Sequence, residues 1–211
     1  LASAILTGNR RALSQGITDR NPAAAIRSRD VGGIEVSRNR PLSYAEIKTM
    51  FQFLDSGKHR IRQSTIIGMK LLMLTGVRTG SLIQAEWDEI DLENNLWTIP
   101  PEHQKLKKSQ PHNPFLVHLS PWVKDLLEQL RDATESRYLI PGRGATLEND
   151  FHAERTVFSS IVRVNTEEIG VPKFIVHDFR STLATRLSEE GIAPHVVDLM
   201  LGHQLGGVAG I

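Results

Sequence analysis

The chain contains no cysteine. This absence excludes disulfide bonds, thiolate metal sites and a cysteine nucleophile, and it agrees with a reducing cytoplasm. Long apolar runs are also missing, because no uninterrupted stretch approaches the roughly 18 residues of a membrane-spanning helix. The N-terminal apolar segment is interrupted by a charged residue at Arg10, so it does not resemble a signal peptide. Residue 1 is leucine rather than methionine, so we expect the chain to be a fragment.

An excess of charge of one sign is lacking as well, since 25 Lys and Arg residues against 24 Asp and Glu residues leave a net charge of +1. DNA binding therefore requires charge segregated onto one face. Local basic clusters lie at 27–40, including Arg38 and Arg40, and at Lys105, Lys107 and Lys108. A solvated loop is the ordinary explanation of each cluster. A chain of 211 residues with 40% hydrophobic and 23% charged residues fits one globular domain, with or without an appendage.

The first forty residues are set apart from the rest. A helix is expected to end before Gly16, and Asn21-Pro22 reads as a stop because the residue before a proline is pushed away from helical angles. Residues 28–40 contain Gly32-Gly33 and few large apolar residues, which is typical of a linker. We therefore predict a domain boundary near residue 40.

Two helices are predicted next. Ser43 and Glu46 form a capping-box pattern at the start of the first. Its helical spacing predicts one buried stripe, made of Ile47, Met50, Phe51 and Leu54. The second helix, at about 61–74, is apolar on most sides and is expected at the centre of the core. It ends at Thr75-Gly76, where glycine permits a turn that projects Arg78.

The rest of the sequence predicts a small sheet followed by further helices. Apolar segments on both sides of Glu93-Asn94-Asn95 indicate a hairpin, and residues 115–119 indicate a third strand. Helices are expected at about 121–133, 150–169, 177–190 and 194–201. The predicted fold is α+β, mostly helical with a small three-stranded antiparallel sheet.

His177 and Arg180 are candidates for anion binding. At positions i and i+3 in the first turn of a helix they share a face, where the helix dipole favours negative charge. Arginine suits bidentate contact with phosphate, and histidine donates to an oxygen or moves a proton. The ordinary explanation is a partly buried histidine and a surface arginine paired with Asp178 or Glu189.

Three further candidates are individually weak. His203 follows Gly202 after a short apolar helix, and its ordinary role is to cap that helix. Arg78 has an ordinary explanation as a turn residue paired with Glu86 or Asp88, and Lys105 has one as a solvated lysine in a loop.

Taken in order, these candidates resemble the catalytic domain of the tyrosine recombinases, particularly phage-type integrases. The order is Arg78 in Thr-Gly-x-Arg-x-Gly, a lysine after a strand, His-x-x-Arg, and Leu-Gly-His at 201–203. The likeness covers about 41–211. Residues 1–27 resemble the end of the helical core-binding domain that precedes it in the family, with 28–40 as the interdomain linker.

The resemblance implies a role for each candidate. Arg78 and Arg180 would hold the scissile phosphate, and Lys105 would protonate the leaving 5′-oxygen, although Lys107 and Lys108 compete for this role. His177 would take part in proton transfer, and His203 would bond a phosphate oxygen. The resemblance also makes Arg38, Arg40, Lys107 and Lys108 candidates for contact with DNA. It implies no metal or cofactor.

The resemblance further implies that the partners are double-stranded DNA attachment sites and, for the full-length protein, three other copies in a tetramer on DNA. It implies a protein of the bacterial cytoplasm, associated with the nucleoid and not with a membrane. Two departures stand out. Ser81 occupies a position that is usually glutamate in the family. The nucleophilic tyrosine is expected directly after Ile211, and Tyr44 and Tyr138 match no part of its motif.

Two other hypotheses remain open from the sequence. One is a DNA-binding protein that descends from a recombinase without its chemistry, although mere binding does not require the full set of candidates. The other is a metal-dependent hydrolase built on His177, Asp178 and His203, which lacks histidine and carboxylate pairs at ligand spacing.

Overall fold

The computed structural model describes residues 40–104 and 113–203. The predictions for residues 1–39, with Arg38, and those for Lys105, Lys107 and Lys108 lie outside the described residues. The chain divides into two units, Leu1–Asn39 and Arg40–Ile211, and every described residue belongs to the second. The assignment of these parts to a core-binding end, a linker and a catalytic domain stays a prediction.

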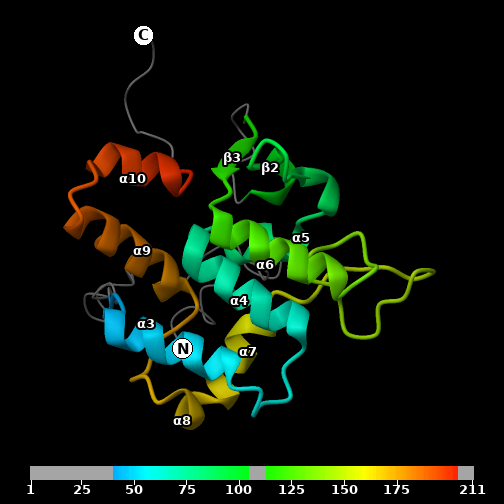
Figure 1. Cartoon of the computed structure of the whole chain (residues 1–211), viewed down its shortest axis with the longest axis horizontal. Coiled ribbons are helices and arrows are strands. Elements are labelled where there is room, and N and C mark those ends of the chain that lie inside the picture. Colours follow the sequence, from blue (N-terminus) through cyan, green and yellow to red (C-terminus); the bar gives the residue numbers. More distant parts are fainter. Residues whose placement is uncertain (1–39, 105–112, 204–211) are drawn as a thin grey trace, which may run out of the picture. The chain divides into compact units, whose positions relative to one another are not determined.

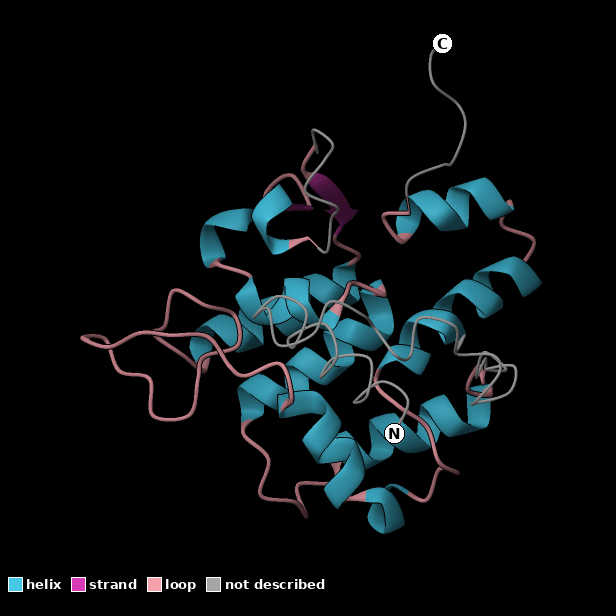
Figure 2. Cartoon of the chain, turned by 180° about the vertical axis from the view of Figure 1, so that it is seen from behind, coloured by secondary structure: helices cyan, strands magenta, loops and turns pink. Residues whose placement is uncertain are grey.

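Helices dominate the described unit, and a small sheet lies at one of its edges (Figures 1 and 2). The α-helices are α3 (Tyr44–Asp55), α4 (Gln63–Thr75), α5 (Thr79–Gln84), α6 (Pro121–Asp132), α7 (Val157–Val164), α8 (Thr166–Ile169), α9 (His177–Glu189) and α10 (Pro194–Met200). The strands are β1 (Ile90–Asp91), β2 (Leu96–Ile99) and β3 (Phe115–His118), and the 3-10 turns are Trp87–Glu89 and Pro101–His103. The predicted fold class is confirmed.

Helix α3 begins as the sequence predicts. The Ser43 hydroxyl accepts from the Glu46 amide at 3.2 Å, and the Glu46 carboxylate accepts from the Ser43 amide at 2.8 Å. The predicted buried stripe is partly wrong, because Ile47 and Phe51 are only half-buried. The Phe51 ring packs against Trp122 with ring centroids 5.2 Å apart. Phe53 is buried instead, because the chain after the helix folds back and brings the His59 ring to 5.0 Å.

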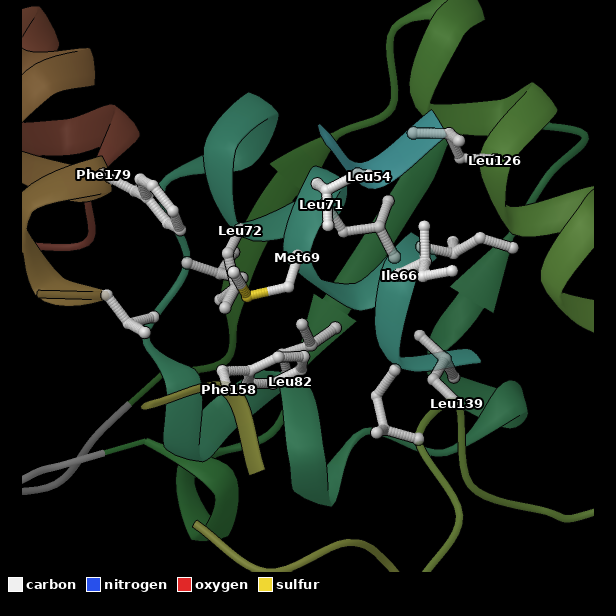
Figure 3. Close-up of a cluster of buried hydrophobic side chains, with 14 of the residues drawn as sticks. Leu54, Ile66, Met69, Leu71, Leu72, Leu82, Leu126, Leu139, Phe158 and Phe179 are labelled. Atoms are coloured by element: carbon white, nitrogen blue, oxygen red, sulfur yellow. The ribbon is translucent and has the colours of Figure 1, made fainter. Parts of the chain in front are cut away.

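Helix α4 lies at the centre of the core, as its apolar sequence predicts. It packs against α6 on one side and α9 on another (Figure 1). A Cβ at Gly68 would lie 2.8 Å from the side chains of Ile140 and Phe158, so these two side chains approach the backbone of the helix closely there. Figure 3 shows side chains from α4, α5, α6, α7 and α9 meeting in this cluster. The core therefore fixes how the ends of α4 and α9 meet.

The three strands form an antiparallel sheet in the order β1-β2-β3. Trp97 pairs with both Ile90 and Val117 across the sheet. Asn95 has φ 57°, the left-handed conformation that an asparagine tolerates in a tight turn. The predicted hairpin and third strand are confirmed.

Two helix predictions are wrong. The helix expected at 150–169 exists only as α7 and α8, because the Asp150 carboxylate accepts from the Ser136 hydroxyl at 2.7 Å and the Arg137 amide at 2.8 Å. Such side-chain bonds hold residues 150–156 in a loop rather than a helical turn. The second error is an omission, since α5 follows Arg78 where the sequence indicated only a turn. None of the helices in 40–104 and 113–203 is long and apolar enough for a bilayer.

Candidate active site

The turn that carries Arg78 is shaped by Gly76. Gly76 ends α4 with φ 63°, and its amide bonds the Leu72 carbonyl at 3.1 Å. A Cβ there would lie 2.7 Å from Leu183 and 2.8 Å from Leu201, so the chain is pressed against α9 and the end of α10. Only glycine fits both the backbone angle and the contact. Arg78 follows in extended conformation at the N-cap position of α5, where its side chain makes no capping hydrogen bond.

Arg180 links this turn to the end of α10. Its guanidinium donates from Nη1 to the Gly76 carbonyl at 2.6 Å and from Nη2 to the Leu201 carbonyl. The residue is buried, with 7% of its surface exposed. It is therefore not the surface arginine of the ordinary explanation, and it pairs with neither Asp178 nor Glu189. Glu189 pairs with Arg186 instead.

The two arginines form an uncompensated cationic pair. Burial, together with the nearby charge of Arg78, lowers the pKa of Arg180 to about 10. Burial also lowers the pKa of Arg78. Both groups stay protonated at neutral pH, and neither forms an ion pair with a carboxylate anywhere in the described part of the chain. Glu86 and Asp88 thus do not pair with Arg78, contrary to its ordinary explanation. A buried and a half-buried cation, each without an ion-pair partner among the described residues, favour a bound anion.

The start of α9 is fixed by Asp178 rather than by His177. The buried Asp178 carboxylate accepts from the Ile175 amide at 2.8 Å. Its carbonyl accepts from the Thr182 hydroxyl at 2.6 Å, and Thr182 in turn accepts from the Leu42 amide at 2.8 Å. His177 is the first residue of the helix and is exposed, whereas Arg180, three residues later, is buried. The two side chains that were predicted to share a face therefore differ in solvent exposure.

His203 caps α10 and remains half-exposed. Its amide bonds the Asp198 carbonyl and the Gly202 amide bonds Leu199, both at 2.9 Å, with Gly202 at φ 62°. These bonds form a Schellman motif. The imidazole Nδ1 lies 2.8 Å from an Asp198 carboxylate oxygen. A Cβ at Gly202 would lie 3.2 Å from the Phe115 ring, so this helix end reaches the sheet. The capping role is therefore real, and it fixes the position of the ring.

A polar cavity of about 280 Å³ opens beside Arg78. Ser81, Glu102, His103 and Arg155 are among its lining residues, and Arg180, His177 and His203 do not line it. The buried Ser81 hydroxyl donates to the His103 carbonyl at 2.7 Å. Ser81 therefore ties α5 to the segment after β2, at the position where the family usually has an acid. A larger cavity of about 500 Å³ lies beyond the start of α4 and contains no candidate residue.

Sequence reasoning missed His103 and Arg155. His103 lies two positions before Lys105 and had no motif to mark it. Arg155 lies in the loop that was predicted to be a helix, so no face could be assigned to it. Arg40, a predicted DNA contact, is paired with Glu46. Its contact with DNA stays a prediction.

The metal hydrolase hypothesis gains no support from the geometry. Asp178 is buried and committed to the Ile175 amide, whereas His177 is exposed. Among the residues that the structure describes, no group of three histidine or acidic side chains is arranged to hold a metal ion.

A mostly helical domain with a three-stranded antiparallel sheet, in which Arg180 bonds the Gly76 carbonyl at the end of the central helix, has the fold of solved integrase structures. Residues 40–207 match the phage integrase family. The chain belongs to that family.

Relatives of this chain include integrases. The chain is 27% identical over 203 residues to prophage integrase IntZ of Escherichia coli K12, covering 92% of this chain and 45% of the relative. It is 28% identical over 209 residues to the integrase of enterobacteria phage P4, again covering 92% and 45%. The chain thus spans about half the length of these curated relatives.

Solved structures share the fold. A lambda integrase dimer bound to a COC′ core site superposes with a TM-score of 0.63 at 20% identity, covering 100% of this chain and 73% of that one. The Tn1549 transposon integrase in complex with circular intermediate DNA gives 0.66 at 15% identity, covering 98% and 72%. At these identities the likeness concerns the fold.

Proposed function

We propose that this chain carries the phosphate-binding part of a site-specific DNA recombinase that cuts and rejoins strands through a 3′-phosphotyrosine. The observation that carries the proposal is the Arg78–Arg180 pair, in which the charge of the half-buried Arg78 lowers the pKa of the buried Arg180 and neither guanidinium forms an ion pair with a carboxylate of the described residues. Family membership supports it, since the named relatives are integrases.

In this proposal the arginines hold the scissile phosphate. Arg180 uses one hydrogen on each of Nη1 and Nη2 for the carbonyls of Gly76 and Leu201. A guanidinium has five N–H donors, so those on its remaining edges stay free for phosphate oxygens. Because the group is fixed by two backbone contacts, it needs little reorganisation as charge develops in the transition state. Arg78 supplies the second charge from the adjacent turn.

The remaining roles follow the family resemblance. A tyrosine oxygen attacks the phosphorus, a 3′-phosphotyrosyl bond forms, and the bond to the 5′-oxygen breaks. Lys105 is the proposed donor of the proton to that oxygen, with Lys107 or Lys108 as competitors. His177 assists proton transfer around the tyrosine, and His203, held by Asp198, bonds a phosphate oxygen. The 5′-hydroxyl of a partner strand then attacks, so bond energy is conserved, and no step in this scheme calls for a cofactor.

The proposed partners are double-stranded attachment sites and, in the whole protein, three further copies. A lambda integrase tetramer bound to a Holliday junction shows that arrangement for a protein with the same fold. We place the protein at the bacterial chromosome, where such DNA lies.

The test uses the protein that the source gene encodes, read past Ile211, with a nicked suicide substrate. We expect a tyrosine directly after Ile211 and a covalent protein–DNA adduct. Arg180→Ala should abolish the adduct and leave duplex affinity within about tenfold, because one phosphate contact among several contributes only about 1 kcal/mol to duplex binding. A natural stop codon after Ile211, or duplex binding with no adduct, would instead support the non-catalytic DNA-binding protein.

A further inference from the structure

His103 lies beside Arg78 at the described edge of the hairpin. It ends the 3-10 turn Pro101–His103 after β2, and its side chain is 20% exposed. Its backbone is anchored, because its carbonyl accepts from the Ser81 hydroxyl at 2.7 Å. Ser81 follows Arg78 by three residues in α5. The two cavity walls that carry Arg78 and His103 are therefore joined by a partly buried hydrogen bond.

The imidazole of His103 is oriented by Glu89. Its Nδ1 lies 2.6 Å from Oε1 of Glu89, whose side chain is only 7% exposed. The same carboxylate accepts from the Trp97 indole at 2.9 Å and from the Glu86 amide at 3.1 Å. Burial raises the pKa of Glu89, and these donors oppose the rise. A carboxylate held by three donors has one orientation, and it gives the ring one orientation too.

His103 lines the cavity, and its bond to Glu89 engages Nδ1 and leaves Nε2 available for another contact. Within 40–104 and 113–203, hydrogen bonding of the ring involves Nδ1 alone. A ring with a carboxylate on one nitrogen and a phosphate on the other is stabilised as imidazolium, which donates from both nitrogens. Carboxylate–histidine pairs that fix a ring in this way serve to present the second nitrogen.

We propose that His103 is a further phosphate-contacting residue of this site, donating from Nε2 to an oxygen of the DNA phosphate that Arg78 holds. Glu89 and Ser81 are its positioning residues, Glu89 through the ring and Ser81 through the backbone. This inference rests on the proposed function, since it assumes that the cavity receives a DNA phosphate.

Replacement of His103 by asparagine or by glutamine distinguishes a phosphate contact from a purely structural role. The amide nitrogen of asparagine takes roughly the place of Nδ1, so His103→Asn keeps a donor for Glu89 and removes Nε2. Glutamine places its amide near Nε2, so His103→Gln keeps a donor for the cavity and leaves Glu89 short of one. His195→Gln, at the exposed start of α10, is the matched control for loss of an imidazole.

Duplex binding by the 211-residue chain is measured by fluorescence anisotropy over a range of salt at about pH 6. Each phosphate contact contributes about 0.9 to the slope of log affinity against log salt. We expect His103→Asn to lower that slope by about one and the affinity about tenfold, while His195→Gln changes neither. His103→Gln should keep more of the affinity than His103→Asn.

A double-mutant cycle tests the part of Glu89. Glu89→Gln should lower duplex affinity when His103 is present and have no further effect in His103→Asn. A merely structural Glu89 would lower affinity equally in both. Near-UV circular dichroism establishes that each variant is folded.

The outcomes separate the two proposals. If the wild-type chain binds duplex DNA and His103→Asn keeps its salt slope, His103 touches no phosphate and this inference is overturned. If the wild type itself shows no salt-dependent binding, the proposed function fails first. A folded His103→Asn variant whose slope of log affinity against log salt is lower by about one supports the contact between His103 and a phosphate.

Discussion

Arg180 donates a hydrogen bond to the carbonyl of Gly76 at 2.6 Å, across a buried contact between α9 and the end of α4. The residue that the motif assigns to phosphate binding therefore also holds together the turn that presents Arg78. The guanidinium of Arg180 therefore has a structural role beside the chemical role proposed for it. Its replacement should affect both the stability and the site.

Replacing Arg180 with lysine should destabilise the protein by about 2 kcal/mol, because an ammonium group cannot bridge two carbonyls as a planar guanidinium does. Urea unfolding gives the free energy. Lys70→Arg, at a partly exposed ion pair with Asp55, serves as the control and should change stability by less than about 0.5 kcal/mol. Equal stability of Arg180→Lys and wild type would mean that the two carbonyl bonds contribute little.

Gly76→Ala should destabilise far more than Gly57→Ala. Both glycines have positive φ, 63° and 64°, so both alanines carry the same backbone cost of about 1–2 kcal/mol. Only at Gly76 would the new Cβ meet neighbours, at 2.7 and 2.8 Å, whereas nothing lies within 4 Å at Gly57. We expect an additional cost of about 1–3 kcal/mol from overpacking, measured as the difference between the two variants in urea. If both variants lose the same free energy of unfolding, the side chains of Leu183 and Leu201 can move to accommodate the new Cβ without measurable cost.

Sulfate or phosphate should stabilise the protein against heat more than chloride at equal ionic strength. The anion offsets the cost of holding Arg78 and Arg180 desolvated and close together, and a ligand that binds the folded state alone stabilises it by about 1–3 kcal/mol well above its dissociation constant. Because sulfate also acts on protein surfaces in general, the test is the difference between wild type and Arg78→Gln. The same sulfate effect in both proteins would rule out a specific site at this pair.

Acid should destabilise the wild type more steeply than Glu46→Gln. Hydrogen bonding to the Ser43 amide, assisted by Arg40, lowers the pKa of Glu46 below its ordinary value of 4.5. The folded state therefore holds fewer protons than the unfolded state in this range, so the contribution of Glu46 is present above pH 4.5 and is lost as pH falls through the lowered pKa. Urea midpoints measured across this range should differ near neutrality and converge in acid. Parallel curves would show that the capping box is not coupled to protonation.

The sequence predicted secondary structure correctly where the residues of one short segment determine its conformation. Ser43 and Glu46 satisfy each other's backbone within one turn, and Gly76 ends α4 because its backbone angle excludes other residues. The order of Arg78, His177, Arg180 and His203 indicated the family without any knowledge of the fold. The loop at 150–156 was misread because Asp150 is held by Ser136 and Arg137, which are distant in the sequence.

The sequence by itself thus determined the fold class, the family and the identity of the candidate groups, since periodicity, capping and motif order are properties of neighbouring residues. Tertiary structure alone decided that Arg180 is buried on the carbonyls of Gly76 and Leu201, that Ser81 holds His103, and that Glu89 orients its ring. These contacts join residues from different elements, so their energies depend on how α4, α9 and the hairpin pack. No local pattern records that packing.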